Sequence, residues 1–348
     1  MKQLVSLEIY HIVRELQVLL GGKVSKVYQP DDKEIVIDFH KTGLGKRLLR
    51  IIPGLAIYLT TKKRPNPDAQ LGFSKLLRKR LTNTRIESIT QKDFERIVEL
   101  KFKSKEGSYI LIAEFLPNGT LILCHPDYKI ISALEYQKWR DRKLLPNQPY
   151  VYPPSKSLNP LDITEEGLSN AIKDMERSSL VKFLAIELSL GGKYSEYLCK
   201  EADLDKDSKS LSAEEVYRLS IKLKEMLAAA YPSLKEDDAF LFSGRINSFN
   251  DALDEYYGKY IEHEDLQEKE TSYNKKLSQL TNILKMQKEQ LESAERSLIE
   301  DKKKGDLIYS HYHKIKEIME AIKLARSKKI SWQEIATKLK PNGIDVSE

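Results

Sequence analysis

Residues 85–124, RIESITQKDFERIVELKFKSKEGSYILIAEFLPNGTLILC, decide how the first part of this chain folds. The stretch holds four runs rich in β-branched and aromatic residues, as is typical of strands with a buried face. Gly107 and Asn118-Gly119 stand between the later runs, where such residues favour hairpin turns. The sequence therefore predicts strands at Arg85–Gln91, Ile97–Lys103, Tyr109–Phe115 and Thr120–Cys124.

The sequence before this stretch has a similar pattern. Apolar residues at helical spacing predict a helix over residues 4–20, which Gly21-Gly22 ends. A proline-rich loop, Lys62–Ala69, precedes a basic helix at Phe73–Leu81. Turn residues separate four further strand-like runs, which are Lys23–Gln29, Glu34–His40, Lys46–Ile52 and Ala56–Thr60. We expect an α+β, sandwich-like domain over about the first 150 residues.

The next part of the chain is predicted to be helical. Five prolines in Pro146–Pro160 indicate a linker, and residues 164–231 then have a helical pattern, with Asp162 and Thr164 as candidate N-caps. Within this part, Leu188–Lys193 (LSLGGK) ends one helix and begins another. This is the form of a helix–hairpin–helix, whose turn presents backbone N–H groups to phosphate. An ordinary helix end followed by a new helix explains the pattern equally well.

A long helix with a coiled-coil seam is predicted from Asn250 onward. Eight residues follow a strict 4-3 spacing, namely Tyr273, Leu277, Leu280, Leu284, Gln287, Leu291, Ala294 and Leu298. A second seam runs through Ile308, Tyr312, Ile315, Met319 and Ile322. The register can continue across Gly305, so one long helix is favoured over a hairpin. So narrow an apolar stripe needs a partner helix, from a further segment of the chain, a second copy or another protein.

Charge is concentrated in one region of the chain. The sequence carries a net charge of +6, yet residues 41–105 hold 17 Lys/Arg and five Asp/Glu, which makes that region +12 and the remainder −6. A basic region beside an acidic remainder favours a nucleic-acid partner over a solvated basic face. The two cysteines, far apart, and the lack of a signal peptide or long apolar run are typical of a cytoplasmic protein.

The usual catalytic patterns are missing from the sequence. It contains no phosphate-binding glycine loop, no nucleophile elbow and no H-E-x-x-H motif. The six histidines are scattered, and His311 and His313 would face different sides of a helix. We therefore expect neither a metal site nor a cofactor.

Several stretches along the chain together carry a family resemblance. They are Leu7–Leu16 (LEIYHIVREL), Val24–Gln29 (VSKVYQ), Phe73–Leu81 (FSKLLRKRL), Trp139–Arg142 (WRDR) with Tyr150–Pro154 (YVYPP), Leu188–Cys199 (LSLGGKYSEYLC), Phe249–Tyr257 (FNDALDEYY) and Ser331–Ile335 (SWQEI). In this order they resemble the NFACT family, whose members include bacterial and archaeal RqcH, eukaryotic NEMF and proteins once described as fibronectin-binding. The pair Trp139–Arg142 and Tyr150–Pro154 is similar to the archaeal and eukaryotic branch.

The resemblance implies an architecture of four parts. Residues 1–155 would form an NFACT-N domain similar to the body of formamidopyrimidine-DNA glycosylases, and residues 156–248 an all-α helix–hairpin–helix domain. Residues 249–330 would be a coiled-coil arm, and residues 331–348 the start of a middle region. The RNA-binding NFACT-R domain of the family would not be included.

The resemblance also implies a function in ribosome quality control. Family members bind a large ribosomal subunit, its rRNA and its proteins, that still carries an obstructed peptidyl-tRNA. They recruit aminoacyl-tRNA, typically alanyl-tRNA, and the nascent chain is extended at its C-terminus without mRNA. Because the ribosome makes the peptide bond, the chain would be an RNA-binding factor and not an enzyme.

The family's tRNA-binding residues can be matched to positions of this chain. Arg96 matches an Arg of the family, and Glu95 and Glu8 stand where the family has Asp. A second family patch is matched by Glu114 and Phe115. Phosphate contacts are expected from the basic helix, through Lys75, Arg78, Lys79 and Arg80.

Three other interpretations are kept open. Glu95 and Arg96 could form a surface ion pair without a ligand. The chain could be a protein-binding adhesin or scaffold that uses its coiled coil, as a monomer or a homodimer. It could also be a DNA glycosylase-like enzyme, although Lys2 and Gln3 occupy the places of the N-terminal proline nucleophile and its adjacent Glu.

Overall fold

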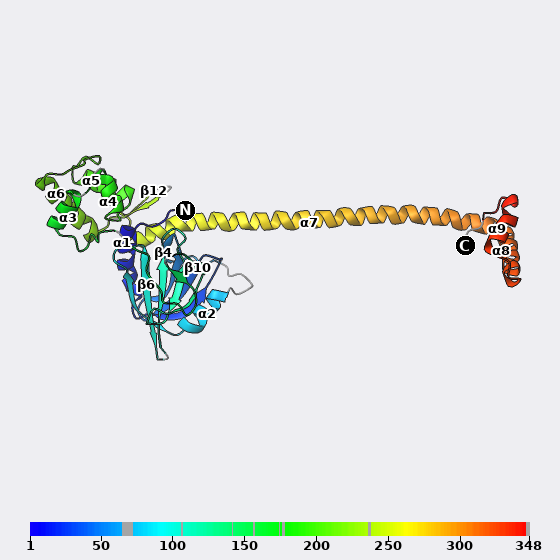
Figure 1. Cartoon of the computed structure of the whole chain (residues 1–348), viewed down its shortest axis with the longest axis horizontal. Coiled ribbons are helices and arrows are strands. Elements are labelled where there is room, and N and C mark those ends of the chain that lie inside the picture. The colour runs from blue at the N-terminus through cyan, green and yellow to red at the C-terminus, as the bar shows by residue number, and fades with distance from the viewer. Residues whose placement is uncertain are drawn as a thin grey trace. The chain divides into compact units, whose positions relative to one another are not determined.

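The structure, a computed structural model (Figure 1), describes residues 1–64, 72–105, 107–140, 142–155, 157–173, 175, 178–235 and 238–345. The expected proline-rich loop at Lys62–Ala69 lies largely outside the described residues, as does Asp141 of the Trp139–Arg142 stretch. The chain divides into two compact units, residues 1–264 and residues 265–348. Each is described by itself.

Antiparallel strands form the body of the first unit. Within the described residues a nine-stranded sheet has the order β4-β3-β2-β1-β5-β6-β7-β8-β9. Its strands are β1 (Lys23–Tyr28), β2 (Ile35–Lys41), β3 (Gly45–Ile52), β4 (Ala56–Thr60), β5 (Arg85–Gln91), β6 (Ile97–Ser104), β7 (Gly107–Glu114), β8 (Leu121–Cys124) and β9 (Ile130–Ala133). β1 joins β5 where Lys23 lies opposite Arg85, so the sheet consists of two strand groups, as expected. The predicted antiparallel strands are confirmed to within two residues at each end.

The two strand groups face one another across the main core. Phe39 of β2 and Phe102 of β6 stack with their ring centroids 6.4 Å apart, and both rings are buried. Helix α1 (Ser6–Leu16), continued by the short 3-10 helix η1 (Gln17–Leu19), contacts β4 and β5, whereas helix α2 (Gly72–Leu81) contacts β1. The two helices lie on different sides of the strands in Figure 1. The α+β domain is therefore confirmed for its strands and helices.

A second, smaller core covers the outer face of β6–β9. Leu144 and Tyr150 pack there against a cluster that includes Ile97 and Ile112. Two backbone hydrogen bonds attach the segment around Tyr150 to this face. The Ile130 N–H donates to the Gln148 carbonyl, and the Tyr150 N–H donates to the Tyr128 carbonyl. A small antiparallel hairpin, β10 (Gln137–Lys138) and β11 (Lys143–Leu144), precedes it.

The prediction of a linker at Pro146–Pro160 is therefore wrong for the first part of this range, which packs against the sheet. Tyr150 in this stretch is only 5% exposed, and Lys129 pairs with Pro149 in an isolated bridge. Proline lacks an N–H donor, but its carbonyl still accepts hydrogen bonds, and its fixed φ suits an extended edge segment.

The part after residue 156 is helical but not all-α. It contains α3 (Glu165–Lys173), α4 (Leu180–Ile186), α5 (Gly192–Glu201) and α6 (Ala213–Ala228), followed by a hairpin of β12 (Ser233–Lys235) and β13 (Asp238–Phe240). The expectation of an all-α region is thus wrong, because strands of three residues are too short to show a period in the sequence. The Thr164 Oγ1 caps α3 by accepting from the Gly167 N–H at 3.0 Å. The turn between α4 and α5 passes through Gly191 at φ +78°, and its assignment as a helix–hairpin–helix stays a prediction.

The arm helix starts from a well-anchored base. α7 spans Phe249–Ser310, and its first two N–H groups, at Phe249 and Asn250, donate to the Glu15 carboxylate at 2.8 Å each. The Asn250 side chain forms two hydrogen bonds with the Leu59 backbone, where it completes the edge of β4. Such an anchor satisfies N–H groups that the first helical turn leaves free.

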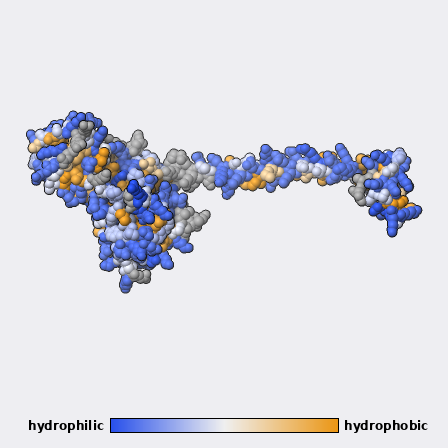
Figure 2. Space-filling view, in the orientation of Figure 1, coloured by the Kyte–Doolittle hydropathy of each residue, from blue (hydrophilic) through white to orange (hydrophobic). Residues whose placement is uncertain are grey.

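The predicted continuous helix through Gly305 is confirmed, since α7 contains this residue. The prediction that the helix and its seam continue unbroken through the second seam is wrong. α7 ends at Ser310, and α8 (Tyr312–Ser327) begins after His311, which has φ −110° and ψ 16°. α9 (Trp332–Leu339) and the 3-10 helix η2 (Lys340–Asn342) follow. Leu277, Leu284 and Leu298 are each at least half exposed on α7, and Figure 2 shows apolar residues among hydrophilic ones along this helix. Among the described residues, no helix is both long and apolar enough to cross a membrane.

Candidate nucleic-acid interface

The turn between β5 and β6 presents Glu95 and Arg96. Asp93 and Phe94 have positive φ values of 43° and 59°, and the Phe94 ring is buried against Tyr10 of α1, with the centroids 5.8 Å apart. The Glu95 N–H closes the turn by donating to the Lys92 carbonyl at 2.6 Å. A buried aromatic ring inside the turn therefore fixes the backbone from which both charged side chains project.

Glu95 and Arg96 do not pair with one another. The Glu95 carboxylate accepts hydrogen bonds from the Ser155 and Ser157 hydroxyls at 2.5 Å each. Among the residues that the structure describes, the half-buried Arg96 guanidinium has neither a hydrogen bond nor an ion pair. Burial lowers the pKa of Arg96, and the charge of Glu95 partly offsets this effect. A partly desolvated cation without a partner gains free energy when an anion binds to it.

Glu114 and Phe115, at the end of β7, lie inside the protein. The Glu114 carboxylate is fully buried, receives two hydrogen bonds from the Arg142 guanidinium at 2.6 and 2.9 Å, and accepts a third from the Tyr150 hydroxyl at 2.8 Å. The Phe115 ring is also fully buried, while its N–H donates to the Arg96 carbonyl at 2.8 Å. Neither side chain is free for direct contact with a ligand, so both can act only by positioning their neighbours.

Glu8 is buried as well. It accepts from the Val5 N–H at 2.9 Å and from the Tyr194 hydroxyl at 2.6 Å, and it forms an ion pair with Lys2. Burial raises the pKa of Glu8, although Lys2 opposes this shift. Lys2 also contacts Asp238 at 2.8 Å. The Lys2 and Glu8 side chains thus join the N-terminal segment, α1, α5 and β13, which is a structural arrangement.

The basic helix α2 forms a separate surface. Lys75 and Lys79 are exposed, whereas Arg78 donates to the Val27 carbonyl at 2.6 Å and Arg80 to the Tyr109 hydroxyl at 3.3 Å. Tyr109 lies near the start of β7. At the other end of this strand, Phe115 follows its last residue and donates its N–H to the Arg96 carbonyl. At ~3.3 Å per residue these two points are roughly 20 Å apart along the strand. The structure therefore brings Arg96 and Glu95 together with Glu114 and Phe115, but not with α2.

Four partner residues were not predicted from the sequence as part of this site. They are Ser155 and Ser157, which bind Glu95, and Arg142 and Tyr150, which bind Glu114. Arg142 belongs to the Trp139–Arg142 stretch, whose mixture of aromatic and basic residues is a signal for nucleic-acid contact. The serines carry no such signal, because their role depends on how the chain folds back on the sheet.

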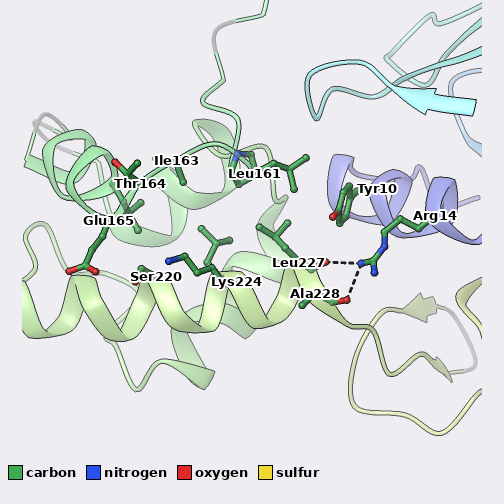
Figure 3. Close-up of a pocket in the computed structure, with 13 residues that line it drawn as sticks. Tyr10, Arg14, Leu161, Ile163, Thr164, Glu165, Ser220, Lys224, Leu227 and Ala228 are labelled. Carbon is green, nitrogen blue, oxygen red and sulfur yellow. Dashed lines mark hydrogen bonds between the residues drawn. The ribbon is translucent and has the colours of Figure 1, made fainter.

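A pocket of about 500 Å³ lies between α1 and the helical part (Figure 3). Tyr10 and Arg14 line it from α1, and Lys224 lines it from α6. The Arg14 guanidinium donates to the carbonyls of Leu227 and Ala228 at 2.9 and 3.0 Å, which are shown as dashed lines in Figure 3. Since these bonds close the C-terminal end of α6, Arg14 joins two parts of the first unit and is not a free cation. Among the described residues, no group of three or more His, Cys, Asp or Glu residues could hold a metal ion.

Comparison with known proteins gives consistent relatives. The chain is 28% identical over 367 residues to an archaeal Rqc2 homolog, aRqcH of Methanocaldococcus jannaschii, covering 98% of this chain and 54% of that protein. It is 26% identical over 375 residues to the human ribosome quality control complex subunit NEMF, covering 95% of this chain and 35% of that protein. The chain thus spans about half the length of the archaeal relative and about a third of the human one.

Solved structures share the fold. The N-terminal part of the fibronectin/fibrinogen-binding protein from Streptococcus suis matches with a TM-score of 0.62 and 25% identity, over 73% of this chain and 99% of that one. The fibrinogen-binding protein from Staphylococcus aureus matches with a TM-score of 0.61 and 22% identity, over 73% of this chain and 98% of that one. The family model described as NFACT N-terminal and middle domains matches residues 6–343. This chain is similar to ribosome quality control proteins of the RqcH and NEMF type, and it belongs to the NFACT family.

Proposed function

We propose that the chain binds tRNA as part of a factor that acts on obstructed large ribosomal subunits. The observation that carries the proposal is Arg96, a half-buried guanidinium with no partner among the described residues. Such a group suits a phosphate or the edge of a guanine base, both of which present acceptors to its fork of N–H donors. The names of the relatives supply the ribosomal context.

The proposed roles of the remaining residues follow from their positions. Glu95, held by two serine hydroxyls, faces the same turn as Arg96 and can accept from the exocyclic amine of an unstacked base. Lys75 and Lys79 on α2 would attract the phosphate backbone from a second surface, while Arg78 and Arg80 hold that helix to the strands. Glu8, Glu114 and Phe115 would position these groups from inside.

In this proposal the chain performs no covalent step. It presents aminoacyl-tRNA, typically alanyl-tRNA, to a large subunit that carries an obstructed peptidyl-tRNA, and the ribosome transfers the nascent chain. The elongated tail grows without mRNA. The helix–hairpin–helix segment around Gly191 and the arm α7 would contribute further contacts to rRNA or ribosomal proteins.

Binding of deacylated tRNA to the chain tests the proposal. We expect Arg96→Ala to weaken binding about ten-fold, or about 1.4 kcal/mol, and to make the dependence of log Kd on log salt shallower. The measurement is fluorescence anisotropy of labelled tRNA at several salt concentrations. Arg47→Ala is the matched control, because it removes an exposed arginine of β3 that binds only a neighbouring carbonyl among the described residues.

The same measurement separates this function from that of a protein-binding scaffold. The exposed apolar residues of α7 and the names of the solved relatives support the scaffold function. A tRNA affinity that is insensitive to salt and equal in Arg96→Ala and Arg47→Ala would rule out the proposed interface.

A further inference from the structure

The β10–β11 hairpin exposes an indole ring in a basic setting. Trp139 lies in its turn and is 39% exposed. Lys138, Arg140 and Lys143 around it are also exposed. Tryptophan and arginine are enriched at recognition surfaces, and an aromatic ring beside cations is the combination that binds single-stranded nucleic acid.

The Trp139 ring is held in place by a chain of buried interactions. The guanidinium of Arg142 lies over the indole, 4.5 Å from the ring centroid. Arg142 itself is only 12% exposed and is fixed by the two hydrogen bonds to Glu114, which Tyr150 also binds. The Trp139 N–H closes the hairpin by donating to the Arg142 carbonyl at 2.9 Å.

This arrangement uses a fully buried carboxylate to orient a surface residue. Burying a carboxylate and a guanidinium costs free energy that their pairing often only just recovers, so the pair contributes more to geometry than to stability. The guanidinium covers one face of the indole, so a flat partner would contact the exposed part of this residue, which is 39% exposed. Because the nearby side chains are cationic, that partner is expected to carry negative charge as well as an aromatic ring.

We propose that Trp139 is a stacking platform for one unpaired nucleobase of RNA, with Lys138, Arg140 and Lys143 on the adjoining phosphates. Glu114 and Arg142 are positioning residues in this proposal. Base–aromatic stacking tolerates any base, since every base has a π-face, and it requires a nucleotide outside a duplex. The proposal rests on the proposed RNA-binding function and adds a second recognition element at the same end of β7 as Arg96.

Tryptophan fluorescence can observe the platform directly, because the chain has two tryptophans, Trp139 and Trp332. Trp332→Phe leaves Trp139 as the sole reporter, and Trp139→Phe leaves Trp332. We expect deacylated tRNA to quench the first variant in a saturable way and the second one little. A blunt RNA duplex without unpaired bases should bind through its phosphates but leave the Trp139 signal unchanged.

Affinity measurements separate stacking from folding. Trp139→Ala is expected to weaken tRNA binding about ten-fold or more, whereas Trp139→Phe, which keeps an aromatic face, should weaken it less than about three-fold. Glu114→Gln should reduce the quenching amplitude of the Trp332→Phe protein, because it loosens Arg142 under the ring. Thermal unfolding of each variant verifies that it is folded.

The outcomes distinguish the two proposals. Salt-sensitive tRNA binding that depends on Arg96, without quenching of Trp139 and without loss in Trp139→Ala, would overturn the stacking platform and leave the proposed function standing. Absence of tRNA binding to the unaltered chain would overturn both. Quenching by the blunt duplex equal to that by tRNA would also reject a role in recognising unpaired bases.

Discussion

His11 on α1 lies where this helix packs against the C-terminal end of α6. It is 5% exposed, and its Nε2 donates to the Met226 carbonyl at the end of α6 at 2.9 Å. Burial lowers the pKa of His11 to about 4, although the Met226 carbonyl favours the charged form, and the nearby Arg14 adds a smaller lowering effect. The neutral imidazole is therefore the form that the folded protein accommodates.

This lowered pKa predicts a pH dependence of stability. The unfolded chain binds a proton at His11 near pH 6.5 and the folded chain only near pH 4, so the folded state loses stability as the pH falls through this window. The loss is up to about 3 kcal/mol for a shift of this size. His11→Gln can keep a donor for Met226 without titrating. Urea unfolding of both proteins at pH 7 and pH 4.5 should show a smaller loss for the variant, and an equal loss would contradict the assignment.

At the scale of elements, the first turn of α7 depends on α1. The Glu15 carboxylate accepts from two N–H groups of α7, and burial raises its pKa while these two bonds oppose the shift. An acid at a helix N-terminus satisfies free donors and interacts favourably with the helix dipole. Glu15 thus satisfies two N–H groups at the start of α7 from more than two hundred positions earlier in the chain, beside Ser248, whose hydroxyl accepts from the Asp251 N–H.

Removal of this cap should loosen the base of the arm. We expect Glu15→Ala to lower the free energy of unfolding by about 1–2 kcal/mol and to speed hydrogen exchange at the amides of Phe249 and Asn250. Glu255→Ala is the matched control, because Glu255 is an exposed acid of the same helix that pairs only with Lys259 among the described residues. Equal exchange rates in the two variants would show that Glu15 does not cap α7.

At the scale of the whole molecule, the basic region divides into two surfaces. Arg96 lies at one end of β7, and α2 contacts the other end through Arg80 and Tyr109. Roughly 20 Å of strand separates them, which exceeds the Debye length of about 8 Å at physiological salt. A molecule as large as tRNA is long enough to reach both surfaces, whereas an oligonucleotide shorter than this separation is not.

This separation predicts additive effects on tRNA binding. Arg96→Ala and Lys79→Ala should each weaken binding, and the double variant should show the sum of their binding free energy changes within about 0.5 kcal/mol. A dinucleotide should respond to one of the two substitutions only. Coupling well above that limit would place both residues at the same phosphates, against the geometry of β7.

Most of the local structure of this protein can be predicted from its amino-acid sequence. Alternating strands, the turns at Gly107 and Asn118-Gly119 and the helix through Gly305 were predictable, because periodicity and turn chemistry act within a few residues. The residues of the Arg96 turn were matched through the family resemblance, and their role in binding stays a prediction. The short strands β10–β13 were missed, since two or three residues carry no period, and the prolines around Tyr150 concealed a packed segment.

Which of the matched residues are accessible depends on how the chain packs in three dimensions. Glu8, Glu114 and Phe115 are buried, Glu95 binds Ser155 and Ser157 instead of Arg96, and α2 lies at the other end of β7. Glu114 and Arg142 are hydrogen-bonded although they are 28 positions apart in the sequence, and Glu8 and Tyr194 are hydrogen-bonded although they are 186 positions apart. Pairings over such distances arise from the way that strands and helices pack, which no local pattern in the sequence records.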